Sequence, residues 1–170
     1  SGANTDFFQN SGARTLVLTG TNTGANTFAI KLDQTGGQTT LQKTGAGTWF
    51  VTNPANNYTG ETIIGGGILN VASLSDYGVP SAIGPRTLAE ENGSETGVGL
   101  HFQGGTLQYT GATPQSTNRN IRVYVNNGAT IDASGSVPEA TLSFTKTGAN
   151  MNLFDTGGTR TITLTGTNSF

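Results

Sequence analysis

The 170-residue chain contains no cysteine and few charged residues. Without cysteine it can form no disulfide framework, thiolate nucleophile or cysteine metal site. Only 11% of its residues are charged and its net charge is -2, so it offers no basic surface for nucleic acid and no polybasic segment for an anionic membrane. No apolar run approaches a membrane span, and Ser1 opens without the pattern of a signal peptide. We therefore expect no nucleic-acid partner and no membrane span in this segment, and any export signal or anchor to lie outside it.

Helical patterns are also missing from the sequence. No window places apolar residues at helical spacing over three turns, and only five residues are proline. The polar content is instead threonine, asparagine, serine and 26 glycines, interleaved with aliphatic residues. Threonine and the aliphatic residues favour strands, whereas glycine and asparagine favour turns. The composition therefore predicts an all-β protein.

Short runs in which apolar and polar residues alternate recur along the chain, each close to a Gly or Asn that suits a turn. One such run places Phe28, Ile30 and Leu32 on one face, and GGG at 65–67 leads into another. Coils wound around a common interior would bury one face of every run. The residues expected to line that interior are Leu16, Leu18, Trp49, Val51, Leu69, Val71, Leu107, Ile121 and Val123.

The two ends of the chain resemble each other. Residues 1–23 match residues 147–169 without a gap, and Arg14 aligns with Arg160, so the offset is 146 residues. We interpret residues 1–146 as one repeat unit, residues 147–170 as the start of the next, and residues 1–170 as one continuous solenoid. An antiparallel Greek-key sandwich is the rival fold, but a closed sandwich gives no reason for its first strand pattern to return. The predicted fold is a right-handed parallel β-helix of about six to eight coils.

The stretch from Leu41 to Val71 resembles the passenger-associated transport repeat, also called the autotransporter-associated β-strand repeat. The pattern of that family opens with L, K, G, G and T, continues through N-x-Y-x-G-x-T, and closes on G-G-x-L-x-V. The matching positions are Leu41, Lys43, Gly45, Gly47 and Thr48, then Asn56 or Asn57, Tyr58, Thr59, Gly60 and Thr62, and finally Gly66, Gly67, Leu69 and Val71.

The resemblance implies a β-helical passenger on the outer surface of a Gram-negative bacterium, where such proteins serve as adhesins and stalks. It carries the expectation of an extracellular, cell-surface location. We expect a structural stalk or fibre segment that assembles by end-to-end stacking of tandem repeats. Its expected partners are neighbouring copies of the repeat, joined head to tail either covalently or noncovalently, together with surface glycans or host or cell-surface ligands.

Residues that could support catalysis or metal binding are sparse. The sole histidine, His101, lies between Leu100 and Phe102, so it is expected on the opposite side of the strand, pointing to solvent. No GxSxG or HExxH motif is present. We expect no enzyme activity and assign no catalytic, cofactor-binding or metal-binding residue.

Two sets of acidic residues could bind a cation if their carboxylates converged. Glu90, Glu91 and Glu95 form the one acidic cluster, which we interpret as a solvated loop, with a weak calcium site as the alternative. Asp132 and Asp155 are far apart in sequence, although stacking could bring them together.

Two other functional classes are compatible with a β-solenoid. A carbohydrate-active or carbohydrate-binding β-helix is the alternative to the structural role, although the former needs clustered carboxylates. An ice-binding solenoid is less favoured. Threonines such as Thr161, Thr163 and Thr165 would form an outward face, but the loops at residues 73–84 and 85–97 interrupt the regular coil length that ice binding needs.

The match between the two ends also predicts the geometry of assembly. If the two matching segments occupy equivalent coils, Arg14 and Arg160 should have the same surroundings. Coils of roughly 18 to 25 residues, stacked about 4.8 Å apart, would give an axial repeat of about 30 to 40 Å.

Overall fold

The structure of the chain is a computed structural model that describes residues 11–87, 99–146 and 157–166. All the secondary structure in these ranges is β-strand, and every strand pairing is parallel. Within the described ranges we find no helix of a length and apolar character that could span a membrane. The all-β prediction is confirmed.

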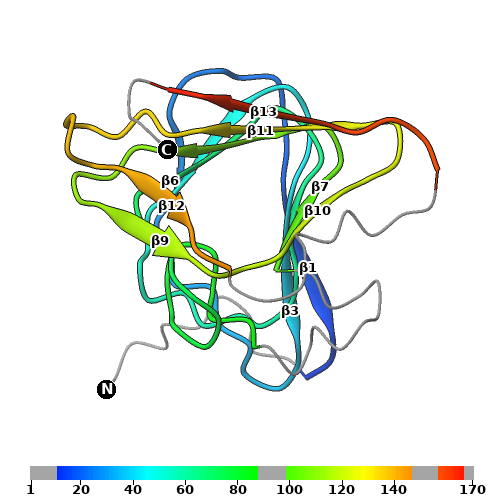
Figure 1. Cartoon of the computed structure of the whole chain (residues 1–170). Coiled ribbons are helices and arrows are strands. Elements are labelled where there is room, and N and C mark those ends of the chain that lie inside the picture. Colours follow the sequence, from blue (N-terminus) through cyan, green and yellow to red (C-terminus); the bar gives the residue numbers. More distant parts are fainter. Residues whose placement is uncertain (1–10, 88–98, 147–156, 167–170) are drawn as a thin grey trace.

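The strands form three parallel sheets, which lie on different sides of the molecule in Figure 1. Sheet A contains β1 (Arg14–Leu18), β3 (Thr39–Lys43), β5 (Thr62–Ile64), β7 (Leu100–Phe102) and β10 (Ile121–Val123), in that order. Sheet B contains β2 (Asn26–Phe28), β4 (Thr48–Val51), β6 (Ile68–Val71), β8 (Thr106–Tyr109), β11 (Gly128–Asp132) and β13 (Thr161–Thr165). Sheet C pairs β9 (Gln115–Thr117) with β12 (Leu142–Phe144).

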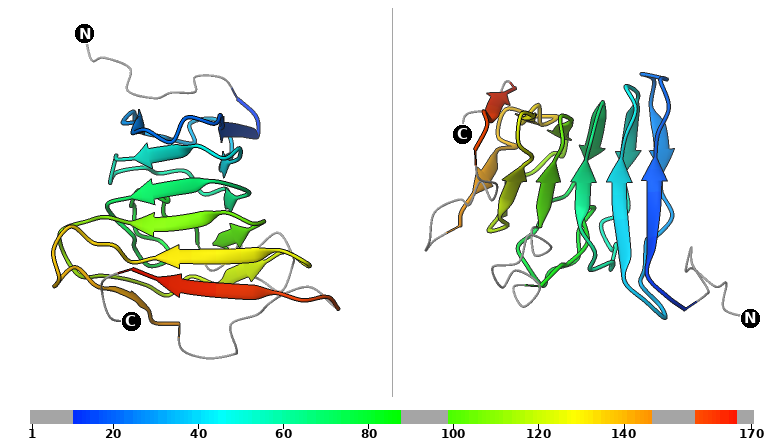
Figure 2. Two further views of the ribbon diagram at one scale, coloured as in Figure 1. Left: turned by 90° about the horizontal axis from the view of Figure 1, so that it is seen from above. Right: turned by 90° about the vertical axis from the view of Figure 1, so that its right-hand side faces the viewer.

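The order of these strands in the chain shows how it winds. Each of the first five turns contributes one strand to sheet A and the next strand to sheet B, and Figure 2 shows the successive turns stacked from β1 at one end to β13 at the other. The fold is therefore a parallel β-helix, and the antiparallel sandwich is excluded. Sheet B contains six strands, which lies at the lower end of the predicted number of coils.

The interior is built from side chains that occupy the same position in successive coils. Leu69 of β6 lies between Trp49 of β4 and Leu107 of β8 in the strand register. The predicted interior is confirmed, because its members belong to one hydrophobic cluster or pack against it. Leu18, Val51, Leu69, Val71, Leu107, Ile121 and Val123 are buried, whereas Leu16 and Trp49 are partly buried.

The coils differ in length, and some exceed the predicted range of roughly 18 to 25 residues. Trp49 and Leu69 are 20 residues apart in adjacent strands, within the expected range. Leu69 and Leu107, however, are separated by 38 residues, and Ile131 and Leu164 by 33. The longer turns accommodate segments outside the strands, so the stacking register does not require a constant coil length.

Part of the first long turn, which the sequence predicted as a loop, is packed against the rest of the chain. Leu74, Ala82 and Ile83 are buried. The guanidinium group of buried Arg119 donates to the backbone oxygens of Ser75, Ile83 and Gly84. These contacts hold residues 74–84 against the turn before β10.

The two arginines of the matching ends lie in different surroundings. Arg14 begins β1 of sheet A and donates to the carbonyl oxygens of Thr35 and Gly37. Arg160 precedes β13 of sheet B and donates to the carbonyl oxygen of Val123. The prediction that these arginines are equivalent was wrong. The two similar sequences occupy different sheets, so a simple translation along the axis does not relate them.

Candidate functional site: contacts between coils in residues 41–71

Residues 41–71 contain the strands β3 to β6 almost completely and thus form most of two successive coils. The apolar positions of the resemblance, including Leu41, Leu69 and Val71, lie in the core. Gly60 and Gly67 lie where backbones approach closely. A Cβ at Gly60 would lie 2.1 Å from the Thr39 oxygen, and one at Gly67 would lie 2.3 Å from the Gly47 oxygen. The glycines of this stretch therefore permit one coil to stack directly on another.

Lys43 is a polar member of the interior. It lies between Leu18 and Ile64 in the register of sheet A, and its side chain is fully buried. Its Nζ donates to the carbonyl oxygens of Thr44 at 2.7 Å, Gly45 at 2.9 Å and Gly66 at 2.9 Å. We call this group of atoms the lysine site. Burial lowers the pKa of Lys43, because desolvation disfavours an ammonium ion, and the three carbonyl oxygens replace its water ligands.

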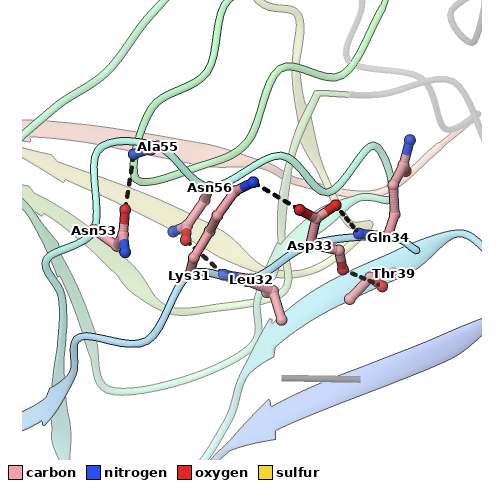
Figure 3. Close-up of polar contacts among 8 residues, drawn as sticks. All are labelled: Lys31, Leu32, Asp33, Gln34, Thr39, Asn53, Ala55 and Asn56. Atoms are coloured by element: carbon pink, nitrogen blue, oxygen red, sulfur yellow. Dashed lines mark hydrogen bonds and ion pairs between the residues drawn. The ribbon is translucent and has the colours of Figure 1, made fainter. Parts of the chain in front are cut away.

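Asn56 links three turns of the chain on the side away from sheets A and B. Its Oδ1 accepts a hydrogen bond from the Leu32 backbone N–H at 2.8 Å, and its Nδ2 donates to the Ala82 carbonyl at 3.0 Å. Figure 3 shows the bond to Leu32. We call this pair of bonds the asparagine bridge. The sequence left open whether Asn56 or Asn57 fits the repeat pattern. Asn56 is the fully buried one, while Asn57 is half-buried.

Tyr58 follows closely and is also fully buried. Its hydroxyl forms a 2.8 Å hydrogen bond with the Thr62 hydroxyl. Burial raises the pKa of Tyr58, so the phenol stays neutral and its polar end is satisfied inside the core.

A surface ion pair lies beside the asparagine bridge (Figure 3). Lys31 Nζ is 2.7 Å from Asp33 Oδ2, and the other Asp33 oxygen accepts from the Gln34 N–H. Burial alone would raise the pKa of Asp33, but the hydrogen bonds from Lys31 and the Gln34 N–H outweigh burial and lower it. Gln34 in turn accepts from the Thr59 N–H and hydroxyl in the next coil.

The prediction that His101 points to solvent was wrong. Its neighbours Leu100 and Phe102 are in the core, so His101 does face the other side of β7, yet only 6% of it is exposed. Its Nδ1 lies 3.4 Å from Glu61 Oε2, and its ring packs against that of Tyr124 at 5.8 Å. Alternation gives the direction of a side chain, but side chains from adjacent coils decide whether solvent reaches it.

The acidic residues do not form a metal site in the described part of the chain. Glu90, Glu91, Glu95 and Asp155 lie outside the described residues. Asp132 accepts hydrogen bonds from Gln108 Nε2 and the Ser134 hydroxyl. Among residues 11–87, 99–146 and 157–166, no three His, Asp or Glu side chains lie close enough together to hold an ion.

The roles of Lys43 and Asn56 were not recognised from the sequence, although the signal for Lys43 was present. Leu41 and Lys43 are two residues apart in one strand, so both must face the interior. A lysine at an inward position requires buried acceptors. Asn56 gave no such signal, because its partners lie 24 and 26 residues away in the chain.

Comparison with known proteins shows what the chain and its residues 41–71 are similar to. The family model described as passenger-associated-transport-repeat matches residues 41–71. The chain is 38% identical over 158 residues to the adhesin BmaC autotransporter of Brucella suis biovar 1 (strain 1330); the match covers 93% of this chain and 4% of the relative's length. None of the solved structures matches the chain. Residues 41–71 therefore carry the sequence pattern of a passenger-associated transport repeat, and the chain is similar to a segment of an autotransporter adhesin, which implies an extracellular, cell-surface location.

Proposed function

We propose that the chain is a non-catalytic spacer: a stretch of stalk in a larger cell-surface adhesin. The observation that carries the proposal is the in-register stacking of six parallel strands in sheet B, fastened between coils by the buried polar side chains of residues 41–71. Such a stack extends in one direction and is stiff, because each coil is hydrogen-bonded to the next.

The partner that we propose for each unit is the neighbouring unit of the same polypeptide. The chain spans only 4% of the length of the relative that it matches, which supports covalent continuation of the solenoid. The different sheets of β1 and β13 do not support noncovalent stacking of identical ends. We therefore propose a stalk made by one long chain.

Adhesion itself would require a ligand at the bacterial surface or on a host. The relative is named an adhesin, and glycans or host-surface proteins are the ligand classes that we propose for the full-length protein. Within this segment we propose a structural contribution, with no catalytic, cofactor-binding or metal-binding residue.

The length of proteins made of tandem copies tests the spacer function. Proteins of one, two and three copies of residues 1–146 should lengthen by about 24 Å per copy, as five strand spacings of about 4.8 Å require. Small-angle X-ray scattering should show a constant cross-section. Units that tumble as separate bodies, with a flexible-chain scattering profile, would contradict a stiff spacer.

The alternative functions have direct assays. Cleavage of pectin-like or other acidic polysaccharides by the same tandem proteins would favour the carbohydrate-active β-helix. Thermal hysteresis of the freezing point would favour the ice-binding solenoid. We expect neither activity above that of a buffer control.

A further inference from the structure

The ammonium group of Lys43 is buried without a carboxylate partner. Ion pairs join Lys31 with Asp33 and His101 with Glu61, and neither involves Lys43. Its three hydrogen-bond acceptors are backbone carbonyl oxygens. An ammonium ion has three donors and no acceptor, so the lysine site satisfies every N–H of the group.

The carbonyl groups are held in place by contacts that do not involve the lysine head. Gly45 has a φ of 68° and Gly67, which follows Gly66, has a φ of 57°. The Gly65 N–H donates to the Lys43 carbonyl at 2.7 Å, so the backbone itself joins the two coils at this corner. The three oxygens should therefore keep their arrangement when the lysine head is removed.

We infer that the carbonyl oxygens of Thr44, Gly45 and Gly66 form a binding site for a primary ammonium ion, which Lys43 occupies as a ligand tethered to the chain. The ligand class follows from the geometry, because the acceptors surround one nitrogen at 2.7 to 2.9 Å. A tetraalkylammonium ion, which has no N–H group, cannot replace these hydrogen bonds. The inference is independent of the spacer function, since it concerns one site within two coils.

The test is chemical rescue of Lys43→Ala in the full 170-residue chain. This variant lacks three methylene groups and the ammonium, and propylammonium supplies the same atoms. Thermal unfolding is measured in propylammonium, tetramethylammonium and sodium chloride at equal ionic strength. Lys43→Met is the matched control, because its side chain fills the space without an ammonium group.

We expect propylammonium to raise the Tm of Lys43→Ala above its value in the other two salts. Ligand at five times its Kd shifts the folding equilibrium sixfold, which for a chain of this size raises Tm by about 2–4 °C. The wild type and Lys43→Met should show no difference among the three salts. Equal Tm values for Lys43→Ala in all three salts, or the same rise in Lys43→Met, would overturn the inference.

The inference can still be tested if Lys43→Ala fails to fold. If Lys43→Ala does not fold in sodium chloride, the yield of folded protein after refolding is compared in the three salts. Recovery in propylammonium but not in tetramethylammonium supports the site. No recovery in propylammonium contradicts it, because the ligand restores all the missing atoms.

Discussion

Leu69 is the residue whose burial most directly reports the stacking of coils. It is fully buried between Trp49 and Leu107. Leu69→Ala should reduce the free energy of unfolding by roughly 2 to 5 kcal/mol, because the coils above and below prevent the cavity from closing. Urea unfolding measures the loss, and Val79→Ala, at a position that is 49% exposed, is the control. An unchanged stability of Leu69→Ala would show that the core is not packed as described.

Asn56 permits a second test at the residue scale. Asn56→Ala removes the acceptor of the Leu32 N–H and the donor to the Ala82 carbonyl. Each buried group left without a partner costs about 1–3 kcal/mol, so the variant should unfold at markedly lower urea concentration. Asn57→Ala, at the half-buried neighbour, should be less destabilised. Equal losses in the two variants would argue against the asparagine bridge.

Ionisation of Asp33 should make the free energy of unfolding depend on pH. Its pKa in the folded chain is lowered from 3.8, so the contribution of its ionised form to stability is present above the unfolded value. That contribution is lost as the pH falls through the lower, folded value. Compared with Asp33→Asn, the wild type should therefore lose free energy of unfolding as the pH is reduced below about 4. The free energy of unfolding of both proteins is measured as a function of pH. If it falls equally in the two proteins as the pH is lowered, the ionised form of Asp33 does not stabilise the fold.

At the scale of single elements, glycine determines how closely two strands approach. A Cβ at Gly60 would lie 2.1 Å from the Thr39 oxygen, whereas the nearest atom to a Cβ at Gly65 would be 3.4 Å away. Gly60→Ala should therefore displace β5 from β3 and destabilise the chain by about 1–3 kcal/mol, the usual cost of overpacking. Gly65→Ala should have a smaller effect. The melting temperatures of the two variants provide the comparison, and a Gly60→Ala protein as stable as Gly65→Ala would contradict the close approach.

The strands were largely predictable from the sequence. The positions whose burial was predicted wrongly have physical explanations. Alternation identified Leu69, Leu107 and Ile121 as interior because every coil repeats the same two faces. It failed at Ile30, which is 51% exposed because β2 ends at Phe28. It also gave the wrong exposure for His101, because side chains of neighbouring coils cover that residue.

For the candidate site, the family pattern contained the residues but indicated neither their roles nor their contacts. Lys43, Gly60 and Tyr58 stood out through the family pattern, whereas their partners belong to other turns of the chain. The asparagine bridge joins residues 32, 56 and 82. Such contacts follow only when the register of the coils is known.

At the scale of the whole molecule, the axial length of the stack does not follow from the number of residues in the chain. The 146-residue offset suggested an axial repeat of about 30 to 40 Å. From β2 to β13, sheet B contains five spacings, or about 24 Å. The stack advances less over these strands than coils of roughly 18 to 25 residues would give, because two turns of more than 30 residues each add one strand only. The length of such a chain depends on its number of turns, not on its number of residues.

The hydrogen bonds of Lys43 and Asn56 to neighbouring coils end on backbone atoms. Every amino acid supplies a carbonyl oxygen, and every one except proline supplies an N–H. Point mutations in the adjacent coils therefore preserve the partners of both side chains, provided that the backbone keeps its path. A gene that encodes this segment could diverge in sequence, or exchange coils by recombination, while each copy of the repeat continued to attach to whatever coil lay next to it.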